Sequence, residues 1–336
     1  MKTAIVTGCA GLLGSHFSRH LINRGYKVIG IDDLSGGYKE YLPTQESDKF
    51  SFYEFNLSWP LGAKIQLNDI FEQEKPIVCF HFAAYAAEGL SPFIRHFNYT
   101  NNILSSVQII NACINHDVKL VFTSSMAVYG DQPSPFNEQM NPRPIDPYGI
   151  AKYAIEQDIK VAAEQHGLRY TIIRPHNVIG IRQNIWDKYR NVAGIFIRKA
   201  LSGEPILIYG DGEQTRAFSD IKYYMEPFER VIDDFNGHTF NIGADKFYTI
   251  NQLADKVCLA ANKSGIKVCK KTAEARHEVK HAHCDHTLAK QELDFSDSTD
   301  LEELICEMFT WASKEPVREQ KVMQYEISKG IYEYWK

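Results

Sequence analysis

Short runs of consecutive apolar residues alternate with helical periodicity through the first half of the chain. The apolar runs occupy residues 3–6, 27–31, 77–82 and 120–123, and residues 12–24 show the first helical pattern. A strand that is apolar on consecutive positions is buried on both faces, as in a parallel sheet covered by helices. The pattern therefore predicts an α/β fold with a doubly wound parallel sheet.

A long helix and a further strand continue this alternation. The helix is expected at about residues 147–166, because its first residue is a proline, which suits the first turn of a helix. The strand is expected at residues 170–173, where Arg174 and Pro175 stop it. Both elements are expected to belong to the same sheet domain.

Beyond Pro175 the predicted elements become shorter, which indicates a second lobe. Residues 228–233 and 239–242 nevertheless show the pattern of one more helix and strand that return to the sheet. The two parts of the chain are therefore expected to interleave. We assign residues 1–175, with a returning segment of about 222–245, to a Rossmann-type domain and residues 176–221 and 246–336 to a smaller α+β substrate-binding lobe.

Composition and charge exclude several classes of partner. With 336 residues and 44% hydrophobic content, the chain can bury a large core. A net charge of -5 gives no broad basic surface, so neither nucleic acid nor an anionic membrane surface is expected as a main partner. No run approaches the ~20 apolar residues of a membrane span, and no secretion signal is recognised at the start. Seven scattered cysteines fit free thiols in a reducing cytoplasm.

Three glycines between the first predicted strand and the first predicted helix form a candidate phosphate-binding loop. Gly8, Gly11 and Gly14 follow the spacing G-x-x-G-x-x-G. Backbone N–H groups and the helix dipole at such a loop can hold a pyrophosphate, and the missing side chains permit its close approach. A tight turn with close helix packing is the alternative explanation of the three glycines alone.

An acidic residue ends the second predicted strand. Asp32 stands 18 residues after Gly14 and is followed by Asp33. A carboxylate at this place accepts hydrogen bonds from the 2'-hydroxyl of an adenosine ribose. A 2'-phosphate would meet negative charge there, with no Arg or Lys before Lys39. The sequence therefore favours NAD over NADP as cofactor.

A tyrosine and a lysine on the long predicted helix form a candidate proton-transfer pair. Tyr148 and Lys152 are four residues apart, so they share one face of a helix. A fixed ammonium can stabilise a phenolate that would otherwise need a pH near its free pKa of about 10. As an isolated spacing, the pair could equally lie on an ordinary solvated helix.

The order of several motifs makes the chain resemble the extended short-chain dehydrogenase/reductase family, in its nucleotide-sugar epimerase branch typified by UDP-glucose 4-epimerase. The resemblance runs through most of the chain. Its motifs are the glycine loop, H-F-A-A at residues 81–84, S-S-M-A-V-Y-G at 124–130, Y-x-x-x-K at 148–152, R-P-H-N-V-I-G at 174–180 and G-D-G-E-Q-T-R at 210–216. Each motif is weak alone, but their order is highly specific.

The resemblance implies a set of residues that bind NAD. Asn56 and Leu57 would flank the adenine, Ala83 and Ala84 would line the cofactor, and Asn102 would lie near the nicotinamide. The alternative for Asn102 is an amide on a helix surface. The full expected set is Gly8, Gly11, Leu12, Leu13, Gly14, Asp32, Asp33, Asn56, Leu57, Ala83, Ala84, Asn102, Tyr148, Lys152 and Pro175.

The resemblance also implies a catalytic set of Ser125, Tyr148 and Lys152. In the family mechanism the tyrosine takes the proton of the sugar C4 hydroxyl while hydride passes to NAD, and the hydride then returns to the other face of the 4-keto sugar. Ser125 would hydrogen-bond the same oxygen, whereas Ser124 would have a structural role. Relatives that dehydrate or decarboxylate sugars carry acidic residues where this chain has Met126 and Ala127, which argues against both reactions.

For the nucleotide diphosphate, the resemblance points to two arginines, Arg216 and Arg276. Guanidinium groups suit phosphate oxygens because their fork matches two of them. A surface salt bridge is the alternative role of each arginine. The expected substrate-binding residues are Ser125, Met126, Asn177, Leu207, Tyr209, Arg216, Arg276 and Glu278.

Five potential metal ligands crowd into ten residues near the C-terminal end of the second lobe. They are His277, His281, His283, Cys284 and His286. Imidazole and thiolate together are compatible with zinc. The segment matches a sugar-nucleotide loop of the resembled branch and lacks a paired zinc motif, so no metal site is expected.

The leading hypothesis is a cytoplasmic, NAD-dependent nucleotide-sugar 4-epimerase, with a UDP-sugar as the expected substrate. A nucleotide-sugar reductase or dehydrogenase with net cofactor turnover is one alternative. A catalytically silent protein that senses NAD or a nucleotide sugar is another. The family implies a homodimer formed through the helix that carries Tyr148 and the helix near residues 102–116, although apolar positions on both could equally be core packing.

Overall fold

The larger part of the molecule is built on a seven-stranded parallel sheet with the strand order β11-β6-β5-β4-β1-β2-β3. The structure, a computed structural model, describes residues 1–44, 47–276, 278–320 and 322–335. The strands are β1 (Thr3–Thr7), β2 (Lys27–Asp32), β3 (Phe50–Glu54), β4 (Val78–His81), β5 (Lys119–Thr123), β6 (Tyr170–Pro175) and β11 (His238–Ile242). The parallel α/β sheet predicted from the consecutive apolar runs is confirmed.

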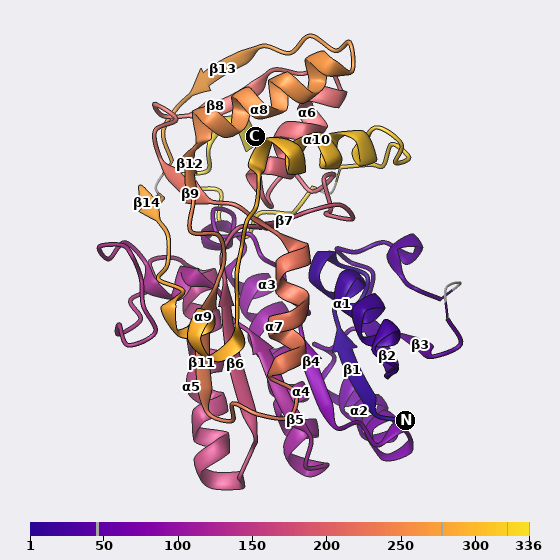
Figure 1. Ribbon diagram of the computed structural model, residues 1–336. Helices are drawn as coiled ribbons and strands as arrows, with labels where there is room; N and C mark the ends of the chain where they lie inside the picture. Colours follow the sequence, from indigo (N-terminus) through magenta and orange to yellow (C-terminus); the bar gives the residue numbers. More distant parts are fainter. Residues whose placement is uncertain (45–46, 277, 321, 336) are drawn as a thin grey trace.

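Helices cover both faces of this sheet, as Figure 1 shows. One face packs against α1 (Leu12–Asn23), α7 (Met225–Arg230) and α9 (Thr287–Leu293). The other packs against α2 (Pro60–Glu74), α4 (Ser105–Asn115) and α5 (Pro147–His166). Successive strand residues point to opposite faces, so Val6 joins the first core and its neighbour Ile5 the second. Consecutive apolar residues of a strand therefore pack into the two cores on opposite faces of the sheet.

A second lobe, at the top of Figure 1, has its own core. Its helices are α6 (Val192–Leu201), α8 (Ile250–Lys263) and α10 (Leu301–Ala312). Around them lie three small sheets, which pair β8 (Ile206–Tyr209) with β13 (Lys270–Ala273), β7 (Val178–Ile179) with β10 (Ser219–Asp220), and β9 (Thr215–Ala217) with both β12 (Phe247–Thr249) and β14 (His281–Ala282). The capping box at Thr249 and Gln252 starts α8.

Short helical segments connect these elements. The stretch before α4 begins with α3 (Arg95–Tyr99) and passes through a π-helical segment, Thr100–Leu104. Short 3-10 turns occur at Lys39–Tyr41, Ser91–Phe93, Met126–Tyr129, Ile221–Tyr224 and Glu333–Trp335.

Two segments differ from the sequence-based prediction. The returning helix, predicted at residues 228–233, begins earlier, as α7, and ends at Arg230. The assignment of all of residues 246–336 to the second lobe is wrong, because Ala289 and Leu293 of α9 belong to the core of the parallel sheet. The cause is a contact between α9 and the returning strand β11, which no local pattern shows.

The C-terminal segment also leaves the second lobe. Trp335 is buried in a cluster with Tyr85, Phe93 and Tyr189, all of which precede the last lobe helix in the chain. Aromatic contacts join its neighbours Tyr332 and Tyr334 to the same cluster. The end of the described chain is thereby held against the sheet domain.

Two further observations concern membrane crossing and the cysteines. Within the described residues, none of the helices combines the length and the apolar character that a membrane crossing requires. All seven cysteines are free thiols.

Candidate active site

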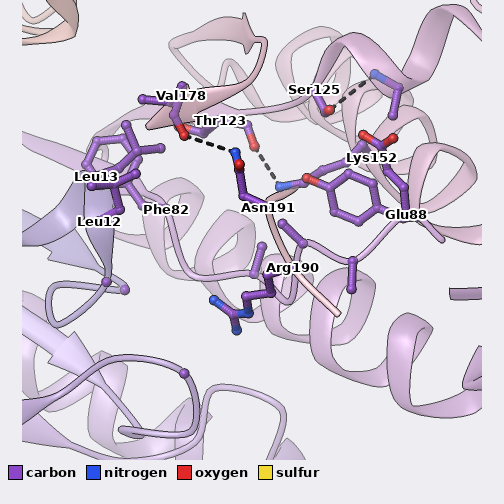
Figure 2. A pocket seen from close by; sticks show the side chains of 18 of the residues that line it. Leu12, Leu13, Phe82, Glu88, Thr123, Ser125, Lys152, Val178, Arg190 and Asn191 are labelled. Carbon is purple, nitrogen blue, oxygen red and sulfur yellow. Dashed lines mark hydrogen bonds between the residues drawn. The ribbon is translucent and has the colours of Figure 1, made fainter. Parts of the chain in front are cut away.

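A cavity of about 740 Å³ opens at the carboxyl ends of the parallel strands and extends to the second lobe. Strand order reverses between β1 and β4, and ligands of doubly wound sheets bind at such a switch point. Figure 2 shows Leu12, Leu13 and Phe82 on one side of the cavity and Glu88, Ser125 and Lys152 on the other. The cavity therefore joins the glycine loop to the predicted catalytic residues.

The glycine loop has the geometry that a dinucleotide pyrophosphate needs. Helix α1 begins after Gly11, and within the described chain no side chain caps its first N–H groups. Gly8 has a φ of +67°, which disfavours any side chain. A Cβ atom on Gly14 would lie 2.2 Å from the Gly8 carbonyl oxygen. The uncapped N–H groups face a cavity that suits a phosphate anion, so the loop fits NAD.

The Asp32 carboxylate is fixed at the end of β2 by two backbone amides. Its Oδ2 accepts a hydrogen bond from Ala10 N at 3.0 Å and its Oδ1 accepts one from Leu34 N at 2.8 Å. Burial raises the pKa of Asp32, and these hydrogen bonds lower it. Next to it, Asp33 Oδ2 accepts a hydrogen bond from Asn56 Nδ2 at 2.9 Å. Both aspartates line the cavity, where a ribose with free hydroxyls can donate to them.

Helix α5 places Tyr148 and Lys152 on the cavity wall. Pro147 occupies its first turn, and the Asp146 side chain caps it by accepting a hydrogen bond from Gly149 N at 2.9 Å. The Lys152 ammonium donates to the Thr123 carbonyl oxygen at 2.7 Å and lies 5.9 Å from the centre of the Tyr148 ring. The two side chains thus share one helix face, as their spacing predicts.

The pKa of the Tyr148 phenol is raised, not lowered. Burial is the largest cause, the Glu88 carboxylate raises it further, and a hydrogen bond with the Ser125 hydroxyl lowers it. Lys152 does not offset this, because burial lowers the pKa of its own ammonium to about 7. The site therefore holds a neutral phenol, because burial opposes a charge on both side chains.

A buried ion pair lies further along the face of α5 that carries Tyr148 and Lys152. Arg174 donates from Nε to Glu156 Oε1 at 2.8 Å and from Nη2 to Oε2 at 2.5 Å. The Ser124 hydroxyl donates to the same carboxylate at 2.5 Å. Ser124 is therefore structural, as predicted, although its partner is a side chain instead of local backbone. Glu156 stands one further turn along the face that carries Lys152, whose charged form it favours.

The residues predicted to hold the nucleotide diphosphate meet at the far end of the cavity. Arg216 forms an ion pair with Glu278, with Nη2 and Oε2 3.0 Å apart. The Arg276 guanidinium lies 3.6 Å from the centre of the Tyr209 ring and donates from Nε to the Tyr334 hydroxyl at 2.7 Å. The Asn177 Nδ2 is buried and has no hydrogen-bond partner among the described residues. These groups offer two cations and a free donor to an anionic ligand.

Three predicted residues do not line the cavity: Asn102, Leu207 and Tyr209. Asn102 is buried and binds the Tyr85 backbone, because its Oδ1 accepts from Tyr85 N at 2.8 Å and its Nδ2 donates to Tyr85 O at 3.3 Å. It is thus neither a cavity residue nor a surface amide. The other predicted residues line the cavity, namely Gly8, Gly11, Leu12, Leu13, Gly14, Asp32, Asp33, Asn56, Leu57, Ala83, Ala84, Ser125, Met126, Tyr148, Lys152, Pro175, Asn177, Arg216, Arg276 and Glu278.

Glu88, Arg190 and Tyr332 are among the cavity residues that the sequence did not reveal. The Glu88 carboxyl projects into the cavity and makes no hydrogen bond or ion pair with the described residues; the enclosing walls raise its pKa to about 7. Arg190 pairs with Asp187 at 3.2 Å and lowers the pKa of Asp32. None carries a local motif. A charged residue within an apolar stretch, as at Glu88, is the one signal the sequence offered.

The histidine-rich segment divides into separate environments. His277 lies outside the described residues. His281 Nδ1 is 3.0 Å from the Thr215 hydroxyl, and the His283 ring stacks on Phe247. Cys284 and His286 are buried in another place.

Comparisons with known proteins agree with this site. The family described as NAD dependent epimerase/dehydratase matches residues 4–243. A UDP-glucose 4-epimerase of Mycolicibacterium smegmatis is 34% identical over 72% of this chain and 77% of its own length. The crystal structure of the Thermotoga maritima UDP-glucose 4-epimerase with UDP-glucose has a TM-score of 0.84 and 31% identity, covering 93% of this chain and 99% of that one. A UDP-N-acetylglucosamine 4-epimerase of Methanobrevibacter ruminantium, in complex with UDP-N-acetylmuramic acid, has a TM-score of 0.83 and 32% identity, covering 93% and 98%.

Proposed function

Because the chain belongs to the NAD dependent epimerase/dehydratase family, we propose that it is a nucleotide-sugar 4-epimerase that acts on a UDP-hexose. The supporting observation is that one cavity contains the dinucleotide loop, the Tyr148 phenol and two arginines. Tyr148 would be the base beside the nicotinamide, and the two arginines would hold the diphosphate at the other end of the same cavity. Both relatives of known structure compared above are described as 4-epimerases of UDP-sugars.

Bound NAD supplies reversible hydride transfer. Tyr148 is the proton acceptor for the sugar C4 hydroxyl and returns the proton to the same oxygen after the sugar has turned over. The Ser125 hydroxyl, which hydrogen-bonds the phenol, holds that oxygen in line with the base. Lys152 stabilises the phenolate, since its ammonium is anchored on the Thr123 carbonyl beneath the phenol. The protein thereby accepts and returns the proton of the C4 hydroxyl and positions the sugar ring.

Arg216 and Arg276 bind the diphosphate. Substrate entry exchanges the Glu278 partner of Arg216 for phosphate oxygens, which frees the carboxylate for the nucleotide ribose. Asn177 completes the set, because its unpartnered Nδ2 can donate to the diphosphate or to the sugar. Met126 lines the cavity beside Ser125 and provides no acid for dehydration or decarboxylation.

A substrate panel tests the proposal. Purified protein is mixed with UDP-glucose, UDP-galactose and their N-acetyl and uronic forms, because the wall at Ala282 carries only a methyl group. Interconversion of a C4 pair is expected without net change in the absorbance of reduced nicotinamide. Stoichiometric formation or consumption of NADH would instead identify a dehydrogenase or reductase. No turnover of any sugar by NAD-loaded protein would favour the sensing role.

We further propose a homodimer formed through α4 and α5, which are neighbours on one face of the sheet. Leu104, directly before α4, and Ile150 and Val161 of α5 have large apolar side chains that are between 42% and 49% exposed. Burying them against the same surface of a second copy would remove this apolar area from water. Sedimentation is expected to show a dimer that Leu104→Glu with Val161→Glu dissociates. Leu61→Glu, at an exposed position of α2, is the control, and an unchanged dimer in the double variant would refute the proposal.

A further inference from the structure

A buried cluster of His176, Cys284 and His286 lies outside the cavity just described. His176 follows β6, whereas the other two residues lie between β14 and α9. One potential donor atom of each lies within 4.8 Å of the others. We propose that these three side chains bind a zinc-class divalent cation through both imidazoles and the thiolate. The proposal is independent of the epimerase reaction.

The His286 ring is oriented by a carboxylate. Its Nδ1 donates a hydrogen bond to Asp245 Oδ1 at 2.9 Å, and Lys290 holds Asp245 Oδ2 at 2.6 Å. A neutral ring that donates through Nδ1 presents a lone pair at Nε2. Carboxylate partners of this kind fix the tautomer of histidines that bind metals. The Nε2 lone pair of His286 is therefore directed at His176.

With a neutral His286, the facing His176 ring has no protonation state that satisfies both of its nitrogens; an imidazolium at His286 that donates from Nε2 to His176 is the alternative to a metal ion. Its Nε2 lies 2.7 Å from His286 Nε2, and its buried Nδ1 makes no hydrogen bond of good geometry with the described residues, although the Ala217 backbone lies near enough to favour a protonated ring. An N–H on Nε2 leaves Nδ1 a buried acceptor without a partner, which is unfavourable. An N–H on Nδ1 leaves two lone pairs facing each other. Either a proton or a metal ion between the two Nε2 atoms removes this conflict, and the Cys284 thiol within 4.8 Å favours the metal ion.

The His176 ring fits in this position only because residue 243 is a glycine. A Cβ atom at Gly243 would lie 2.0 Å from His176 Nε2. The two imidazole planes are 11° from parallel, with centroids 4.9 Å apart. Zinc–nitrogen bonds of about 2.0–2.1 Å in a tetrahedral site would separate the nitrogens to about 3.3 Å. Binding thus requires the rings to part by about half an ångström, which leaves the fourth position to a small ligand such as water.

Ligand chemistry selects the metal class. Two imidazoles and one thiolate suit Zn²⁺, whereas Mg²⁺ and Ca²⁺ prefer oxygen ligands. A second group of potential ligands, formed by His20, Glu226 and Glu229, does not qualify. The Arg24 guanidinium already pairs with both of its carboxylates and occupies the place of a cation.

The position of the cluster suggests what the metal does. It joins the end of β6 to the segment between β14 and α9, across 110 residues of sequence. That segment directly follows Ala282 of β14, which lines the cavity. The metal would act as a structural clip that holds this wall to the sheet. The sequence-based expectation of no metal considered residues 277–286 alone, and His176 could not be placed beside them without the fold.

Metal binding by the purified full-length chain tests the inference. The protein is dialysed against a chelator and titrated with Co²⁺ and then with Zn²⁺. One equivalent of Co²⁺ per chain is expected, with the near-ultraviolet charge-transfer absorption of a cobalt–thiolate bond, and Zn²⁺ should abolish that absorption by displacement. Failure to bind stoichiometrically, or binding without thiolate absorption, would show a hydrogen-bonded histidine pair instead and overturn the proposal.

Variants locate the site. Cys284→Ser and His286→Asn are expected to lose the stoichiometric binding and the charge-transfer absorption. Cys258→Ser and His281→Ala change a thiol and an imidazole outside the cluster and should keep both. Circular dichroism and NAD retention show whether each variant folds. If a cluster variant does not fold, the charge-transfer absorption of the wild-type protein alone decides whether the site binds metal. Equal metal binding by folded Cys284→Ser would contradict the assignment.

Discussion

The Tyr148 phenol is buried between a carboxyl group that opposes its ionisation and a hydroxyl that favours it. Glu88 raises the pKa of the phenol and the Ser125 hydrogen bond lowers it. Burial lowers the pKa of the neighbouring Lys152 ammonium as well, and the Glu156 carboxylate raises it. The protonation of the phenol is therefore set by its neighbours in the cavity wall as well as by its burial.

Replacing the phenol tests its role as the base. Tyr148→Phe removes the hydroxyl and retains the ring, so epimerase turnover is expected to fall about 10²–10⁴-fold. NAD retention, measured by the nicotinamide content after gel filtration, should not change. The control is Tyr153→Phe, on the same helix but packed outside the cavity. Near-normal turnover of Tyr148→Phe would mean that another group accepts the proton.

Glu88 should set part of the pH dependence. With a pKa of about 7, its carboxyl loses a proton as the pH rises through neutrality, and the resulting anion raises the pKa of Tyr148. Glu88→Gln removes this charge, so the ascending limb of kcat/KM against pH should move to lower pH. Below about pH 6 the two profiles should converge, since Glu88 is then mostly neutral.

The comparison with the wild type is essential because Lys152 titrates in the same range. Glu292→Gln, on the exposed side of α9, serves as the control for loss of one carboxylate. A profile for Glu88→Gln that overlays the wild type at every pH would rule out electrostatic coupling between Glu88 and the phenol.

Residues differ in how far the sequence reveals them. Gly8, Gly14 and Asp32 belong to one strand–helix–strand unit, so their spacing was sufficient to predict that they lie close together at the cavity. Glu88 and Tyr332 reach the cavity only through packing of distant segments. The sequence could not show for the same reason that Asn102 lies away from the cavity, since its amide binds the backbone of Tyr85, 17 residues away.

At the scale of elements, α5 shows how local signals position chemistry. Pro147 and the Asp146 cap fix where the helix begins, and Gly167, with a φ of +73°, ends it in the left-handed region. These signals stand in the sequence, which explains why the bounds of the helix were predictable. By contrast α9 was misassigned, since its apolar face meets a strand far away in the chain.

Loss of the α5 cap should weaken the helix start. Asp146→Ala removes the acceptor for Gly149 N and is expected to lower the free energy of unfolding by about 1 kcal/mol. Asp146→Asn keeps a side-chain oxygen and should retain most of this stability. Urea denaturation measures both variants. Equal destabilisation by the two would show that the charge of Asp146, not its hydrogen bond, stabilises the helix.

The buried ion pair between Arg174 and Glu156 should contribute much more to the free energy of unfolding than the Asp146 cap. Glu156→Ala leaves the Arg174 guanidinium buried without its carboxylate and is expected to cost about 3–5 kcal/mol of unfolding free energy. Glu164→Ala, at an exposed position of the same helix, is the control and should change stability by less than about 0.5 kcal/mol. Denaturant titration distinguishes the two, and a loss below about 1 kcal/mol in Glu156→Ala would mean that water reaches the stranded guanidinium.

At the scale of the whole molecule, the C-terminal segment links the substrate end of the cavity to the sheet domain. Tyr332 lines the cavity, and Tyr334 receives the hydrogen bond of Arg276. Trp335 anchors both by its burial among Tyr85 and Phe93. The proposed diphosphate site is therefore held from two directions, by the second lobe and by the end of the chain.

Removing this anchor should affect substrate binding more than chemistry. Trp335→Ala is expected to raise the KM for the nucleotide sugar several-fold with little change in kcat, because Arg276 loses its aromatic surroundings while Tyr148 keeps its own. Trp59→Ala, at an exposed position, should leave both constants unchanged. Steady-state kinetics measures the effect, and a fall in kcat at constant KM would contradict this role of the segment.

The interleaved strand order has a consequence for synthesis of the chain. Strand β6 remains an open sheet edge until β11 has left the ribosome, and the intervening residues up to β10 belong to the second lobe. An unpaired edge is prone to association with other chains. A nascent chain that stalls within the second lobe would thus expose the unpaired edge of β6. A chaperone that binds the chain during this interval would prevent association with other chains.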